Sequence, residues 1–173
     1  MALDEARFGL INWHKKRYCL RGIRPTWTVR REYQWTWLYA AIEPSTGQDF
    51  CLYLPRLDGI CYEVFLKHLS QSFPHELILL IQDNAPAHIN HEVSFPENII
   101  PVPLPAYSPE LNPVERCFLE FRRALANRCF DSLEALEAAL TDVLKSFWLD
   151  PDALKQLCNF PWWLRQLRNY DII

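Results

Sequence analysis

The stretch LILLIQDNAPAH, residues 77–88, joins a short and uniformly apolar run to an acid, an amide and a histidine. Such a run is typical of a strand that is buried on both faces of a sheet. Asp83 follows this strand directly, and ligands gather beyond the carboxyl ends of strands in open α/β sheets. Asp83 is therefore a candidate site residue, although an aspartate that only caps the turn after the strand fits the local pattern equally well.

Periodicity and turn residues predict the elements around this strand. Alternating or apolar segments predict strands at residues 2–10, 35–42, 49–54, 77–81 and 99–104, and helical spacing predicts a helix at 60–73. Three further helices are predicted to open at Asn112 and Pro113, at Asp131 with Glu134 in a capping-box pattern, and at Asp150 and Pro151. We therefore predict one α/β domain over residues 1–173, with a mixed central sheet of about five strands flanked by helices, and C-terminal helices from about residue 112.

The composition narrows the class of protein. Half of the 173 residues are hydrophobic and 14% are aromatic, which is typical of a folded globule. No apolar run approaches the ~20 residues of a membrane span and no signal-peptide pattern is present, so we expect no membrane partner and a cytoplasmic location. The six cysteines are scattered without a CxxC pair, which favours reduced thiols packed mostly in the core over a disulfide framework or a zinc site.

The net charge of −3 conceals a basic segment. Residues 14–31 contain seven lysines and arginines and no acid, with aromatic residues beside and among them. Basic and aromatic residues together suit the phosphates and bases of DNA, whereas a solvated hairpin face is the alternative. The candidate DNA-binding residues are Lys15, Lys16, Arg17, Arg21, Arg24, Arg30 and Arg31, together with Arg122 from a looser basic group that also contains Arg116, Arg123 and Arg128.

Three acids lie where predicted elements place them for chemistry: Asp4 in the first strand, Asp83 after the buried strand, and Glu115 in the first turn of a helix. Carboxylates that are brought together repel one another unless cations neutralise them, and oxygen ligands favour Mg²⁺ or Mn²⁺ over zinc. Two such ions activate an attacking oxygen and stabilise a leaving oxygen in phosphodiester displacement.

Each of these residues also has a structural interpretation. Asp4 fits an exposed strand position, Glu115 fits a capping contact with the backbone of Asn112, and His88 fits a surface or hydrogen-bonded histidine. The histidines of HINH, residues 88–91, form only a weak metal motif.

QDNAPAH, residues 82–88, followed by PAYSPELNPVERCF, residues 105–118, closely resembles the signature of mariner-superfamily DDE transposases of the bacterial insertion-sequence branch. LDEARFGL and WHKKRYCLRGIRP resemble the first-acid segment of that branch, so the resemblance extends from Asp4 to about residue 130. It implies an RNase H-like fold with Asp4, Asp83 and Glu115 as the catalytic and metal-binding acids, and it selects Glu115 over Glu110. It also implies supporting roles for Asn84 and His88.

Two features depart from the family pattern. The interval from Asp83 to Glu115 is a few residues shorter than usual, which affects the loop more than the identity of the acids. Family members carry an N-terminal helix-turn-helix region, whereas only three residues precede Asp4 here. We therefore expect a catalytic domain alone, as a fragment, as one frame of a split element or as a decayed copy.

The leading functional hypothesis is metal-dependent cleavage of double-stranded DNA at transposon ends and strand transfer into a target, with two Mg²⁺ ions that Mn²⁺ can replace. Such a protein would associate with the bacterial nucleoid when bound to DNA. A homodimer is a candidate assembly, with Phe160, Trp162 and Trp163 as contact residues unless they pack in the core. The alternatives are an inactive remnant that only binds DNA or another partner, and a nuclease for RNA–DNA hybrids, against which the SPELNPxE loop argues.

Overall fold

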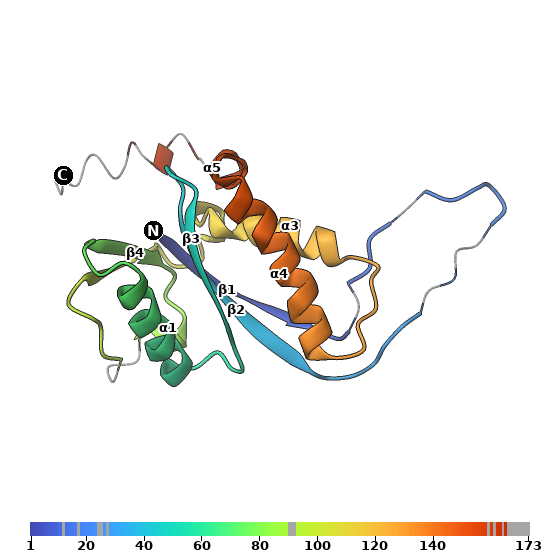
Figure 1. Cartoon of the computed structure of the whole chain (residues 1–173), viewed down its shortest axis with the longest axis horizontal. Coiled ribbons are helices and arrows are strands. Elements are labelled where there is room, and N and C mark those ends of the chain that lie inside the picture. Colours follow the sequence, from blue (N-terminus) through green and yellow to red (C-terminus); the bar gives the residue numbers. More distant parts are fainter. Residues whose placement is uncertain are drawn as a thin grey trace.

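The computed structural model describes residues 1–11, 13–16, 18–23, 26, 28–89, 93–158, 160, 162–163 and 165. Its centre is a five-stranded sheet in the order β3-β2-β1-β4-β5 (Figure 1). The strands are β1 (Ala2–Gly9), β2 (Trp35–Glu43), β3 (Gln48–Leu54), β4 (Ile78–Gln82) and β5 (Ile99–Pro103). β1, β2 and β3 pair antiparallel, whereas β4 pairs parallel to both β1 and β5, so the predicted mixed sheet is confirmed.

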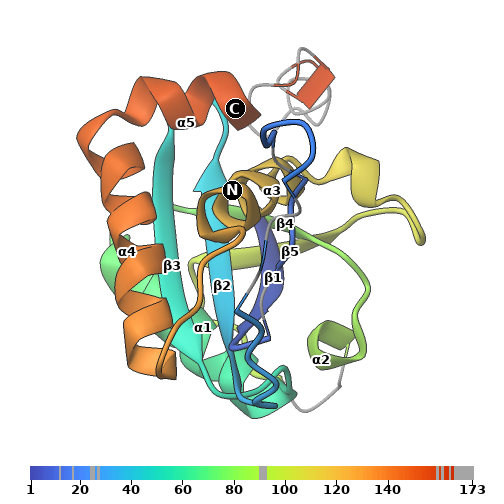
Figure 2. The same cartoon turned by 90° about the vertical axis from the view of Figure 1, so that its right-hand side faces the viewer.

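Helices cover both faces of the sheet (Figure 2). α1 (Gly59–Ser72) packs on one face, and α3 (Val114–Leu125), α4 (Leu133–Leu149) and α5 (Pro151–Cys158) pack on the other. The short α2 (Pro86–Ile89) follows the end of β4, and the 3₁₀ turn η1 (Pro109–Leu111) precedes the start of α3. Phe160, Trp162 and Trp163 pack against the α3–α5 core, which supports the core-packing interpretation of these aromatics.

The alternation of side chains along β1 decides which residues face which helices. Ala2, Ala6 and Phe8 belong to the core beneath α3, whereas Leu3 belongs to the core beneath α1. Asp4 therefore points to the α3 face and Glu5 to the α1 face.

The ladder between β1 and β4 is short. β1 pairs with β2 along its whole length, whereas the one registered pair between β1 and β4 in the described residues joins Ala2 to Ile81. The start of β4 is held by the N-terminus, because the Met1 ammonium donates to the Leu79 carbonyl at 2.8 Å. β4 ends at Gln82, so Asp83 follows directly after this strand while β1 continues to Gly9.

The start of α3 depends on Asn112. Its Oδ1 accepts from the Val114 N–H at 3.1 Å, and its buried Nδ2 donates to the Leu3 carbonyl of β1 at 2.8 Å. The backbone N–H of Asn112 donates to the Pro109 carbonyl, so it is not the partner of Glu115 that the capping interpretation required. One amide side chain thus caps the helix and fixes it to the strand that carries Asp4.

The prediction that Asp131 caps the next helix is wrong. Ser132 is the N-cap of α4, and its hydroxyl accepts from the Ala135 N–H. The Asp131 carboxylate is instead paired with Arg30, whose Nη1 lies 2.8 Å from Oδ1. The opening at Asp150 is confirmed, because Asp150 Oδ1 accepts from the Ala153 N–H.

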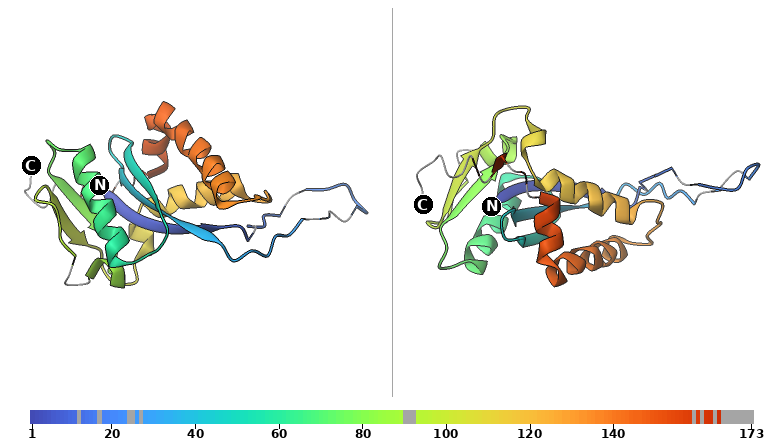
Figure 3. Two further views of the ribbon diagram at one scale, coloured as in Figure 1. Left: turned by 60° about the horizontal axis from the view of Figure 1, so that its bottom comes forward. Right: turned by 90° about the horizontal axis from the view of Figure 1, so that it is seen from above.

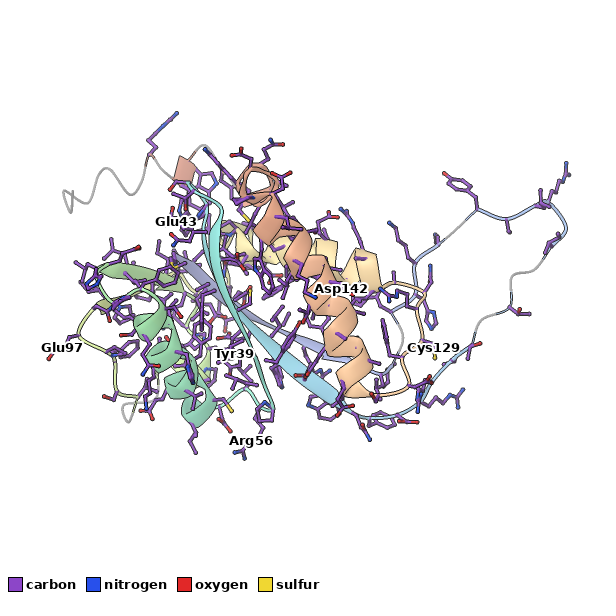
Figure 4. All side chains as sticks on the ribbon, in the orientation of Figure 1. Tyr39, Glu43, Arg56, Glu97, Cys129 and Asp142 are labelled. Carbon is purple, nitrogen blue, oxygen red and sulfur yellow. The ribbon has the colours of Figure 1, made fainter. Side chains whose placement is uncertain are left out.

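The prediction of reduced cysteines packed mostly in the core is confirmed. All six are free thiols, Cys61, Cys117 and Cys158 are buried, and Cys51 packs against the core. Cys19 and Cys129 are exposed, the latter after the end of α3 (Figure 4). No helix in the described part of the chain combines the length and apolar character needed to cross a membrane.

We predict that Asn112→Ala destabilises the protein by about 2–4 kcal/mol, because it removes a helix cap and leaves the buried Leu3 carbonyl without its donor. Ser132→Ala removes only a cap and should cost about 1 kcal/mol. Urea unfolding of both variants measures the difference. Equal losses would show that the bond from Asn112 to β1 contributes nothing.

Candidate active site

A pocket of about 380 Å³ lies beyond the carboxyl end of β4 and beside Asp4 of β1. Asp4, Asp83 and Glu115 all line it, although they come from a strand, from the loop after a second strand and from a helix. The rest of the lining comes mainly from loops and is largely apolar apart from Asn84, Tyr107, Ser108 and Asn112. It consists of Asn84, Ala85, Asn112 and the segment 104–109. The fold therefore brings together the three acids that the sequence singled out.

Asp83 is both a turn residue and a pocket residue. Its Oδ1 accepts from the Ala85 N–H at 2.9 Å, which is the local turn contact expected of an aspartate. The same oxygen lies 2.9 Å from Nδ1 of His88, and the Asp83 side chain remains 56% exposed. The hydrogen bond from His88 is the main cause that lowers the pKa of Asp83 below its ordinary value, so this acid is ionised at neutral pH.

Asp4 has the opposite electrostatic character. Burial first, and then the charges of Glu115 and Glu5, raise its pKa from 3.8 to about 8. The Glu5 N–H donates to Asp4 Oδ1 at 2.8 Å, which only partly offsets this. Asp4 thus resists ionisation mainly because it is buried, and the nearby carboxylates of Glu115 and Glu5 add to this effect.

Glu115 owes its position to the helix start described above. Asn112 fixes the first turn of α3 to Leu3, next to Asp4, and Glu115 lies in that turn. Glu110 in η1 is exposed and is not part of the pocket lining. The choice between these two glutamates, which the resemblance made, agrees with the geometry of the pocket.

His88 lies beneath the pocket rather than at the surface. Its side chain is 1% exposed, and Nε2 lies 3.0 Å from Oε1 of Glu5, whose side chain is 4% exposed. Burial lowers the pKa of His88, but hydrogen bonds to Asp83 and Glu5 outweigh this and raise it to about 10. With both ring nitrogens protonated, His88 donates to Asp83 on one side and to Glu5 on the other.

Two residues of this region escaped the sequence analysis. Glu5 follows Asp4 directly in β1, and nothing in the local sequence indicates that it meets a histidine 83 positions away. Tyr107 lies on the pocket rim, fully exposed, with a left-handed backbone at φ 59°. Such a conformation is uncommon outside glycine and clusters at functional sites, but it leaves no trace in the sequence.

Asn84 ties the pocket loop to the sheet edge. Its Nδ2 donates to the Leu104 carbonyl at 2.8 Å, and the Leu104 N–H donates to the Gln82 carbonyl at 2.7 Å. These bonds continue the β4–β5 pairing past the ends of both strands. Asn84 therefore holds the segment that follows β5 against the loop of Asp83.

No three His, Cys, Asp or Glu side chains within the described ranges lie close enough together to hold a metal ion as they stand. The donor set nevertheless fits a hard divalent cation, because three carboxylates and no soft ligand line one pocket. Burial and carboxylate repulsion raise the pKa of Asp4, and a bound cation would offset both.

The candidate DNA-binding residues fall into different surroundings. Lys15, Lys16, Arg21 and Arg31 are exposed in the segment between β1 and β2, whose described parts extend away from the sheet on the side opposite β4 (Figure 3). Arg30 pairs with Glu32 and Asp131 and thereby anchors the base of this segment. Arg17 and Arg24 lie outside the described residues.

Arg122 lies at the far end of α3 from Glu115. Its guanidinium is 5.9 Å from the ring centre of Phe8 and 5.5 Å from that of Trp13. Arg122, Arg7 and Arg128 line a second cavity of about 90 Å³, and no acid is found among the described residues of its lining.

The order of the sheet, with acids on β1, after β4 and on α3, defines an RNase H-like fold. Residues 1–137 match the family described as DDE superfamily endonuclease, and the chain belongs to this family. This finding confirms the resemblance that QDNAPAH and SPELNPVER indicated. The acids lie within the matched range.

Solved structures of the Mos1 transposase have the same fold. The Mos1 paired-end complex with the left transposon end has a TM-score of 0.68 at 24% identity, over 91% of this chain and 50% of that chain. The Mos1 mariner paired end complex with Mn has a TM-score of 0.64 at 24% identity, over 90% of this chain and 52% of that chain. The chain thus spans about half the length of the Mos1 chains it matches.

A sequence relative is the uncharacterized protein y4pE/y4sA of Sinorhizobium fredii (strain NBRC 101917 / NGR234). It is 34% identical over 99 residues, which cover 56% of this chain and 73% of the relative.

The pKa of Asp4 predicts a stability that falls with rising pH when divalent cations are chelated. An unfolded aspartate loses its proton near pH 3.8 and folded Asp4 near pH 8, so the folded state binds more protons between these values and loses stability as pH rises through them. Asp4→Asn removes this dependence. We compare the free energy of unfolding of Asp4→Asn with that of the wild type by urea unfolding. The difference in favour of the variant should be larger at pH 8 than at pH 5 by more than about 1 kcal/mol. Parallel pH profiles would contradict the raised pKa.

Proposed function

We propose that residues 1–173 form a single DDE transposase catalytic domain, which cleaves DNA phosphodiester bonds at transposon ends and transfers the strand to a target. The observation that carries this proposal is the convergence of Asp4, Asp83 and Glu115 on one pocket in a chain of the DDE endonuclease family. The Mos1 complexes with transposon-end DNA support double-stranded DNA as the partner.

The three acids would hold two Mg²⁺ or Mn²⁺ ions. When bound, such ions supply activation of the attacking oxygen and stabilisation of the leaving oxygen. His88 lowers the pKa of Asp83 further below its ordinary value, whereas Asp4 would have to release its proton to act as a ligand. The protein itself supplies position and negative charge, and its acids need form no covalent bond to DNA.

The surface around the pocket supports a path for DNA along α3. Glu115 and Arg122 are seven residues apart, which is about 10 Å along a helix and about three base-pair steps of a DNA strand. A phosphate at the cavity of Arg122 and Arg128 would thus lie a few nucleotides from the scissile phosphate. Tyr107 on the pocket rim offers an exposed ring on which a base can stack.

Asp83→Asn and Glu115→Gln should each abolish Mn²⁺-supported nicking of a DNA duplex, because each removes an ion ligand from the pocket. Glu110→Gln and Asp142→Asn, which change exposed acids outside the pocket, should leave nicking unchanged (Figure 4). Gel analysis of nicked duplex measures the rates. Full cleavage by purified Asp83→Asn would overturn the proposal.

Calorimetric titration of the wild type with Mn²⁺ separates this proposal from the remnant alternative. An active domain binds Mn²⁺, and the affinity falls in Asp83→Asn. A remnant that serves only as a binding module shows no such site, and a hybrid nuclease would prefer an RNA–DNA duplex in the same cleavage assay.

Arg122→Ala should weaken DNA binding uniformly across sequences and reduce the slope of log K against log salt by about one. Arg123→Ala is the matched control, because it removes the same charge at the next position from a side chain already paired with Glu120. Fluorescence anisotropy at several salt concentrations measures both. Identical behaviour of the two variants would show that DNA does not follow the flank of Arg122.

A further inference from the structure

We propose that Glu5 and His88 form a buried positioning pair that orients Asp83 for binding a divalent cation. This inference rests on the proposed function and deepens it, because it assigns a role to Glu5 and a specific task to His88. Neither residue is among the side chains that line the pocket, so both act through Asp83.

The contacts form one continuous series of hydrogen bonds from Glu5 through His88 to Asp83. Glu5 Oε1 lies 3.0 Å from His88 Nε2, and His88 Nδ1 lies 2.9 Å from Asp83 Oδ1 and 3.2 Å from the Asp83 carbonyl oxygen. His88 therefore holds both the side chain and the backbone of Asp83. These hydrogen bonds run from the buried Glu5 carboxylate to the exposed Asp83 carboxylate, and the His88 imidazole links the two.

The position of these hydrogen bonds relative to the sheet explains why they are needed. β1 and β4 share the Ala2–Ile81 pair in the described residues, so Asp4 and Asp83 lie beyond the reach of the ladder between their strands. Glu5 is the covalent neighbour of Asp4 on the opposite face of β1. The pair therefore connects the strand of the first acid to the second acid where backbone hydrogen bonds no longer do.

The surroundings make the pair rigid. The Tyr62 ring of α1 lies 4.6 Å from the His88 ring, and the Tyr62 hydroxyl donates to Gln82, the residue before Asp83. Side chains that are 1% and 4% exposed have little freedom to choose other partners. Hydrogen bonds of this kind behind a metal ligand commonly change metal affinity by about 10–100-fold when they are removed.

A purely structural pair would stabilise the fold without affecting metal binding. Two substitutions of His88 separate these roles, because each retains one of the two contacts. The amide nitrogen of Asn takes the place of Nδ1 and preserves the bond to Asp83, whereas the longer Gln places its amide nitrogen near Nε2 and preserves the bond to Glu5. Both remove the same ring and the same charge.

The experiment is a Mn²⁺ titration by calorimetry of the full chain and its variants at one fixed pH, with circular dichroism as the folding control. We expect His88→Gln to bind Mn²⁺ about 10–100-fold more weakly than the wild type. His88→Asn and Glu5→Gln should lose less than about tenfold, because the direct contact to Asp83 persists in both. Asp49→Asn, which neutralises a half-buried carboxylate on β3 away from the pocket, should bind as the wild type does.

The double variant Glu5→Gln/His88→Asn tests whether Glu5 acts through His88. It should bind Mn²⁺ as His88→Asn does, because the link between the two is already broken. An additional loss would mean that Glu5 acts on the cation by its charge alone, and would overturn its role in the pair.

Unchanged Mn²⁺ affinity in folded His88→Gln would overturn the proposal. Loss of the fold in Glu5→Gln and both His88 variants, while Asp49→Asn folds, would also overturn it in favour of a structural role. A wild-type chain that neither binds Mn²⁺ nor nicks DNA would instead refute the proposed function.

Discussion

The site depends on where β4 ends beside β1. The registered pair between the two strands joins Ala2 to Ile81, and β4 ends one residue later at Gln82. The ladder therefore does not reach Asp4 and Asp83 and does not fix the distance between these two acids. Side chains from other elements take over this task, so the geometry of the site is set by a few specific hydrogen bonds.

Each acid has its own support. Asn112 ties the first turn of α3 to Leu3, so Glu115 is placed relative to β1 through one amide group. His88 ties Asp83 to Glu5, so the second acid is placed relative to the same strand from the other face. Because β1 is central in the sheet and pairs fully with β2, both supports end on the most constrained strand. The three carboxylates thus share one reference element although they come from distant parts of the chain.

The sequence predicted the elements well because hydrophobic periodicity reports burial directly. The five strands and the helix at 60–73 fall within about two residues of their observed bounds. The prediction failed at the start of α4, where two adjacent residues both suit a helix cap. Ser132 is the cap, whereas the Asp131 carboxylate pairs with Arg30, about 100 positions away. The sequence does not indicate this contact, because it joins residues that meet only in the fold.

The same reasoning resolves the two interpretations of Asp83. A turn cap and a site residue looked like alternatives because each explains the local pattern. In the structure Asp83 Oδ1 accepts from Ala85 and from His88 while the side chain still reaches the pocket. The turn contact is part of what positions the acid, since a carboxylate fixed by its own loop loses less entropy when it binds a ligand. The local pattern therefore singles out Asp83 because of its turn contact. The charge and orientation of Asp83 depend in addition on Glu5 and His88, which come close to it only in the folded protein.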